Sequence, residues 1–160
     1  MTSAVQPDPK DADATAPTVE PIRRILLVED EEDTRNSFQQ LLNMALGIEV
    51  DLAVDGAQAL ERLAEKPYSI VVTDLRMPKV DGLKLIAEIQ TRRLPVTVVV
   101  TTGHGSIDDA VHAMRMGAYD FLTKPPDPQH LCLLIERALR ERTLQDELAA
   151  LRSQISERHR

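Results

Sequence analysis

Five short runs of apolar, β-favouring residues alternate along this chain with segments whose apolar residues recur at helical spacing. The runs lie at residues 25–28, 48–52, 70–74, 96–101 and 119–122. Strands that alternate with helices through short connections run parallel, because each helix carries the chain back to the same edge of the sheet. We therefore predict an α/β fold, a doubly wound five-stranded parallel sheet with helices on both faces.

The helical segments are short and amphipathic. The first carries Phe38, Leu41, Leu42 and Ala45 at the spacing i, i+3, i+4, i+7 and ends at Gly47. The others lie at residues 56–64, 83–89, 107–114 and from residue 131 onward. Aromatic residues make up only 2% of a chain that is 42% hydrophobic, so the core must be aliphatic.

The order of the strands decides which side chains meet. Two orders are common in such sheets, 2-1-3-4-5 and 3-2-1-4-5. Glu29 and Asp30 follow the first run, and Asp74 ends the third. The first order would bring these three carboxylates together at the carboxyl ends of neighbouring strands, where open α/β sheets bind ligands. The second order would separate them by more than one strand spacing.

Three crowded carboxylates repel one another, which raises the pKa of at least one of them unless a cation compensates. Mg²⁺ commonly takes one or two carboxylates and completes its shell with water and phosphate oxygens. The carboxylates therefore indicate a magnesium-dependent phosphate site. Two plainer interpretations stay open: Asp74 as a turn former, and the acids of residues 29–33 as a solvated helix start that favours the helix dipole.

Two further polar residues follow the last two strands. Thr102 follows the fourth run, with Gly103 after it leaving room for close backbone approach, and Lys124 follows the fifth. A hydroxyl and an ammonium group at the same edge would suit a phosphoryl group. Each alone is more simply a turn residue or a surface lysine, and His104 is more simply a solvent-facing loop residue than a proton shuttle. The predicted meeting of Thr102 and Lys124 with the three carboxylates at one edge favours a phosphate site over these simpler roles.

Four motifs stand in the order and spacing of a known family. They are VEDEE at residues 28–32, TDLRMPKVDG at 73–82, TTGHG at 101–105 and GAYDFLTKP at 117–125. On these motifs, residues 23–138 resemble the receiver domain of bacterial two-component response regulators. With its extended last helix, the chain is similar to the front of nitrogen-regulator-type transcription activators.

The resemblance implies a flavodoxin-like sheet of order 2-1-3-4-5 and a phosphoacceptor, Asp74, which would attack the phosphohistidine of a sensor histidine kinase. It also implies that Mg²⁺ is held by Glu29, Asp30, Asp74 and the backbone carbonyl of Arg76. The chain would not be an enzyme in its own right, although it would assist its own phosphorylation and dephosphorylation.

The same resemblance assigns a switch to the phosphoryl group. Thr102 and Lys124 would bond to it, the Lys124–Pro125 bond would be cis, and Phe121 would occupy the switch aromatic position. Phosphorylation would then reshape the face made by the fourth helix, the fifth strand and the last helix, where a homodimer would form. Pro126 departs from the family, which often carries Phe there.

The two ends of the chain differ from its centre. Residues 1–21 are rich in Pro, Ala, Thr and acids without periodicity, which predicts a disordered tail before a receiver domain at residues 22–141.

Residues 142–160 continue the last helix. Leu144, Leu148, Leu151 and Ile155, at spacings of 4, 3 and 4, form a possible coiled-coil seam of about two heptads. A frayed amphipathic extension is the alternative.

Composition narrows the classes of function. The net charge is −7 and the pI about 5.1, which argues against direct nucleic-acid binding. No apolar run approaches the roughly 20 residues of a membrane span, and no secretory core begins the chain, so we expect a cytoplasmic protein without membrane contact. The motifs of an ATPase or a helix-turn-helix are also missing, so any transcription regulation would belong to a larger regulator.

Two classes of function remain. The first is a phosphoacceptor switch that acts through protein–protein contacts. The alternative is a magnesium-dependent phosphatase with an Asp nucleophile. The alternative lacks a separate general acid and a recognisable substrate pocket, and it leaves Phe121 and the C-terminal seam unexplained.

Overall fold

The computed structural model describes residues 23–77, 79–103 and 107–158, and the predicted tail and His104 lie outside these ranges. The strands are β1 (Arg24–Val28), β2 (Glu49–Ala53), β3 (Ile70–Asp74), β4 (Thr97–Thr102) and β5 (Asp120–Thr123). The helices are α2 (Glu32–Leu46), α3 (Gly56–Glu65), α4 (Gly82–Arg92), α5 (Ile107–Met116) and α6 (Pro128–Arg158).

The five strands form one parallel sheet in the order β2-β1-β3-β4-β5, as the resemblance implied. The first strand therefore lies between the second and the third, and Val28 pairs with Thr73. All carboxyl ends of the strands meet at one edge, so the loops that follow β1, β3, β4 and β5 are brought together there.

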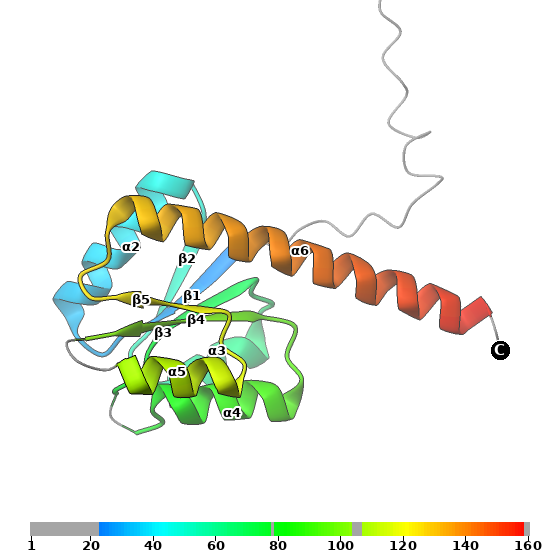
Figure 1. Cartoon of the computed structure of the whole chain (residues 1–160), viewed down its shortest axis with the longest axis horizontal. Coiled ribbons are helices and arrows are strands. Elements are labelled where there is room, and N and C mark those ends of the chain that lie inside the picture. Colours follow the sequence, from blue (N-terminus) through cyan, green and yellow to red (C-terminus); the bar gives the residue numbers. More distant parts are fainter. Residues whose placement is uncertain (1–22, 78, 104–106, 159–160) are drawn as a thin grey trace, which may run out of the picture.

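Helices cover both faces of the sheet (Figure 1). Two helices, α2 and α6, pack on one face, and α3, α4 and α5 pack on the other. The strands bury alternate side chains on the two faces: Ile25 and Leu27 point into one core, and Leu26 and Val28 into the other. This two-sided burial explains why the strands read as continuous apolar runs.

Four of the five strands differ from the predicted ranges by one residue, and β1 does so only at its start, Arg24. The second strand begins at Glu49, with Ile48 buried just before it, and the fifth is shifted toward Thr123. Thr102, expected after the fourth strand, is its last residue. The reason is pairing, since Thr102 lies in register with Thr123 and the ladder between β4 and β5 ends only there.

The last helix, α6, is continuous over 31 residues. Its first half buries Leu131, Leu134, Ile135 and Ala138 against the sheet and α2. Its second half projects beyond the sheet, which confirms the extended C-terminal helix (Figure 1). Among the described residues, no helix combines the length with the apolar character that crossing a membrane requires.

Candidate functional site

Three carboxylates, Glu29, Asp30 and Asp74, meet at the carboxyl end of the sheet and are called here the acidic cluster. Each offers an oxygen atom, and these atoms all lie within 4.8 Å of one another. The meeting follows from the strand order, because Glu29 and Asp30 follow β1 and Asp74 ends the neighbouring strand β3. Glu29 and Asp74 are buried, with exposures of 3% and 8%, whereas Asp30 is exposed.

Lys124 enters this cluster from the loop after β5. Its Nζ donates to Asp74 Oδ2 at 2.7 Å and to Glu29 Oε1 and Oε2 at 2.8 and 3.1 Å. Its backbone N–H donates to the Thr102 carbonyl at 2.8 Å, which fixes the loop beside β4. The Lys124–Pro125 bond is cis, as the resemblance implied. An ammonium group has three protons, so these contacts use its donor capacity fully.

Burial and charge act against each other at this site. Burial raises the pKa of Glu29 from its ordinary value of 4.5 to about 7, although the hydrogen bond and charge of Lys124 oppose the rise. Burial alone would lower the pKa of Lys124, but its hydrogen bonds to Asp74 and Glu29 and their charges outweigh burial and raise it. Lys124 is therefore a cation, and Glu29 takes up a proton at a higher pH than an ordinary glutamate does.

The predicted switch residues lie beside the cluster. Thr102 is buried, at 5% exposure, one residue beyond the Thr101 that pairs with Asp74. Phe121 pairs with Val100 on the next strand, and its half-buried ring packs against the core under α3, α4 and α5. Both residues therefore stand within two strands of Asp74.

The loop after Asp74 is held closely against the end of β3. The N–H of Arg76 donates to Asp74 Oδ1 at 3.2 Å, and the N–H of Gly82 donates to the Leu75 carbonyl at 3.0 Å. A Cβ on Gly82 would overlap the carbonyl oxygen of Asp74, so only glycine lets α4 begin this close to the strand. Glycine at this position therefore helps to position the Asp74 backbone.

One contact at the site was missed from the sequence. Arg35 Nη1 on α2 donates to the backbone carbonyls of Glu29 and Asp30, at 3.0 and 3.3 Å. The sequence did carry a signal for it. A cation in the first turn of a helix opposes the helix dipole, so its presence there calls for a compensating contact.

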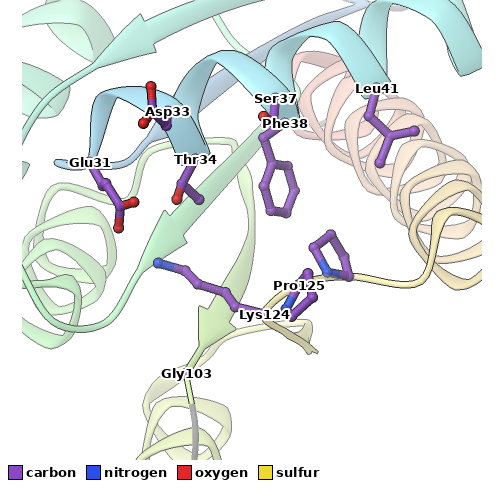
Figure 2. A pocket seen from close by; sticks show the side chains of 10 residues that line it. Glu31, Asp33, Thr34, Ser37, Phe38, Leu41, Gly103, Lys124 and Pro125 are labelled. Atoms are coloured by element: carbon purple, nitrogen blue, oxygen red, sulfur yellow. The ribbon is translucent and has the colours of Figure 1, made fainter.

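A pocket of about 580 Å³ opens beside Lys124, between α2 and the loop that contains Pro125 and Pro126. Figure 2 shows Lys124 reaching from this loop toward the start of α2, near Glu31 and Thr34. The pocket wall combines acidic, hydroxyl and apolar groups. Its lining on this side consists of Glu31, just before α2, and of Asp33, Thr34, Ser37, Phe38 and Leu41 on the helix.

The chemistry of these donors fits a hard divalent cation and a phosphoryl group. An all-oxygen set of carboxylates suits Mg²⁺, and soft sulfur or imidazole ligands do not occur in the cluster. The cation and the ammonium of Lys124 would together neutralise the charge that a phosphoryl group brings. A buried carboxylate beside both, Asp74, is placed to act as a nucleophile.

Comparison with known proteins gives a consistent family. Residues 25–136 match the model of the response regulator receiver domain. The chain is 38% identical over 133 residues to a putative NtrX-like response regulator of Rickettsia bellii, covering 82% of this chain and 28% of that protein. It is also 38% identical over 137 residues to the C4-dicarboxylate transport transcriptional regulatory protein DctD of Pseudomonas aeruginosa, covering 85% and 29%.

Solved structures agree with these relatives. NtrX from Brucella abortus aligns with a TM-score of 0.75 at 36% identity, over 81% of this chain and 29% of that one. A response regulator receiver domain protein from Clostridium thermocellum aligns with a TM-score of 0.72 at 32% identity, over 78% and 99%. The chain thus spans under a third of the length of the two curated relatives.

Proposed function

This chain belongs to the response regulator receiver domains of two-component systems, in their nitrogen-regulator-type group, and on that premise we propose that Asp74 is its phosphoacceptor. The observation that supports this most is the arrangement around Asp74. Its carboxylate is bonded to the Lys124 ammonium and lies within 4.8 Å of oxygens from Glu29 and Asp30. Phosphoryl transfer needs positioning and charge neutralisation more than covalent help.

The proposed step is a displacement at phosphorus. A carboxylate oxygen of Asp74 forms the new P–O bond while the P–N bond to the phosphohistidine of a sensor histidine kinase breaks, and the imidazole leaves. Glu29, Asp30, Asp74 and the Arg76 carbonyl would hold Mg²⁺, which supplies positive charge to the phosphoryl oxygens when bound. Lys124, which already bonds to Asp74, would bond a phosphoryl oxygen, and Thr102 would donate its hydroxyl to another.

The kinase must approach Asp74 from the open edge of the sheet. We place its contact on the pocket between α2 and Pro125–Pro126, because this pocket adjoins Lys124 and has apolar walls at Phe38 and Leu41. Figure 2 shows that Lys124 and these two side chains face the same space. The contact would bring the phosphohistidine to the acidic cluster from that side.

The proposed output passes through α5. Arg76 lies two residues after Asp74 and forms an ion pair with Asp109 on α5 at 2.9 Å. This ion pair connects the loop after Asp74 to α5. Thr102 would move toward the phosphoryl group and Phe121 into the space that Thr102 leaves, which would shift the face of α5, β5 and α6 on which a homodimer would form. The two helices concerned expose apolar side chains: Ile107, Val111 and Met114 on α5, and Leu133 on α6.

The extended helix is the second proposed dimer contact. We infer a receiver domain at residues 22–141 and a coiled-coil linker at residues 142–160. The C-terminal seam of Leu144, Leu148, Leu151 and Ile155 is 45–56% exposed, although apolar side chains usually avoid water. Since the relatives are several times longer, a dimer would pass the signal to further domains of a transcription regulator.

Binding of a phosphoryl analogue tests this function. Beryllofluoride with Mg²⁺ should change the NMR resonances of Thr102, Phe121 and α5 in the wild-type chain, and it should leave those of Asp74→Asn unchanged. Identical changes in both chains would overturn the assignment of Asp74. Sustained turnover of p-nitrophenyl phosphate would instead favour a phosphatase, because a phosphoacceptor has no separate general acid to complete rapid hydrolysis.

A further inference from the structure

The turn between β1 and α2 carries two members of the acidic cluster but lacks the usual helix cap. Asp55 and Asp81 each accept a backbone N–H at the starts of α3 and α4. At the start of α2, Glu31 occupies the cap position and its side chain makes no such bond. A helix start without a capping side chain is less well fixed, so another contact must hold this turn.

Arg35 provides that contact. It lies at the end of the first turn of α2, where its positive charge opposes the helix dipole. Helical side chains lean toward the helix N-terminus, which directs this guanidinium back over the turn. There its Nη1 donates to the carbonyl oxygens of Glu29 and Asp30, at 3.0 and 3.3 Å. Bonds from a charged donor are among the stronger protein hydrogen bonds.

The two acids differ in what else holds them. Glu29 is fixed at three points: its N–H donates to Ala53, its carboxylate accepts from Lys124, and its carbonyl accepts from Arg35. Asp30 is exposed, and within the described ranges the bond from the Arg35 guanidinium to its backbone carbonyl is the one hydrogen bond between Asp30 and a side chain. Arg35 therefore holds the backbone from which the Asp30 carboxylate extends.

We propose that Arg35 is a positioning residue for the divalent cation. It acts through the backbone, by holding the turn so that the carboxylates of Glu29 and Asp30 face Asp74. The inference rests on the proposed function, because it presupposes that the acidic cluster binds Mg²⁺. Groups that orient metal ligands typically change metal affinity by roughly 10- to 100-fold when removed, and we expect an effect of this size.

The test compares Arg35→Gln, Arg35→Lys and Arg62→Gln with the wild-type chain. Arg62 is the matched control: its Nε on α3 donates to the Leu52 carbonyl at 3.1 Å, also half-buried, but no member of the acidic cluster is involved. Mg²⁺ affinity is measured by calorimetry, stability by thermal melting, and exchange of the Glu29 amide by NMR in the metal-free chain.

The expected result separates positioning from general stability. Arg35→Gln should bind Mg²⁺ roughly 10- to 100-fold more weakly, Arg35→Lys should fall between it and the wild type, and Arg62→Gln should bind normally. The Glu29 amide should exchange faster in Arg35→Gln, whose melting temperature should fall no further than that of Arg62→Gln. Labelling by a phosphodonor should recover at saturating Mg²⁺.

Two results would overturn the inference alone: unchanged Mg²⁺ affinity in Arg35→Gln, or equal losses of affinity in Arg35→Gln and Arg62→Gln. Failure of the wild-type chain itself to bind Mg²⁺ would instead overturn the proposed function, and this inference with it. The two failures are therefore distinguishable by the wild-type titration.

Discussion

Glu29 and Asp74 lie nearly buried beside one another, and the ammonium of Lys124 bonds to both. Two carboxylates in a partly buried site would ordinarily share a proton, because burial and mutual repulsion both disfavour the second charge. Lys124 reduces this cost in the metal-free chain. From the sequence we predicted that a cation, Mg²⁺, offsets the repulsion between these carboxylates. The structure adds that Lys124 already supplies one positive charge.

The raised pKa of Glu29 predicts a pH dependence of Mg²⁺ binding. Its pKa is about 7 in the folded chain and 4.5 ordinarily, so the proton stabilises the fold most below pH 4.5, and this contribution is lost as the pH rises to 7. At the proposed metal site, Mg²⁺ would have to displace that proton. We therefore expect calorimetry to show affinity rising by up to about tenfold per pH unit below 7 and levelling off above it. An affinity independent of pH below 7 would contradict this.

Removal of Lys124 tests how much its positive charge offsets the cost of burying Glu29 and Asp74. Lys124→Met leaves Glu29 and Asp74 buried without their partner, so we expect the free energy of unfolding to fall by about 1–3 kcal/mol at pH 8. The loss should be smaller at pH 5, where Glu29 takes up a proton readily. Lys66→Met, which removes an exposed partner of Asp51, should stay within about 0.5 kcal/mol in the same urea titration.

At the scale of elements, the sequence was most informative where burial is two-sided. All five residues of β3 are buried, so the run and its terminal Asp74 could be placed from composition alone. The start of β1 and the exact ends of β2, β4 and β5 could not, because pairing between strands decides them. Contacts that depend on a backbone carbonyl, such as that of Arg35 with Glu29, leave almost no trace in the pattern of apolar residues.

The junction between β3 and α4 depends on close approach at Gly82. Gly82→Ala should lower the free energy of unfolding by about 1–3 kcal/mol, because its methyl group would overlap the Asp74 carbonyl and force the helix start away. Gly103→Ala is the control, since a Cβ there meets no atom within 4 Å. Equal midpoints for both variants in urea would show that α4 does not need this contact.

For the whole molecule, what the sequence predicts about the receiver fold differs from what it predicts about the projecting part of α6. The periodicity of the C-terminal seam predicted a continuous helix, which the structure confirms. The partner of the seam could not be predicted from one chain, because an exposed apolar stripe indicates only that burial against some partner would stabilise it. Glu147 and Arg152 flank the seam five residues apart, the spacing at which parallel coiled coils pair opposite charges.

The dimer proposal makes a prediction about mass. Replacing Leu148 and Leu151 with lysine should lower the average mass in light scattering toward that of a monomer, because each change puts a charge into the seam. Ser153→Lys adds a charge on the opposite side of the helix and should leave the mass unchanged. If the wild-type chain is monomeric with and without beryllofluoride at high concentration, the seam is not a dimer contact of this chain.

The most direct test of the phosphoacceptor is to trap the acyl phosphate. After reaction with phosphoramidate and Mg²⁺, borodeuteride reduction converts a phosphorylated carboxyl group into a deuterated alcohol, which mass spectrometry locates. We predict deuterium at Asp74 alone, and none when Mg²⁺ is chelated. Deuterium at Glu29 or Asp30, or an unlabelled chain under conditions in which another receiver is labelled, would contradict the account.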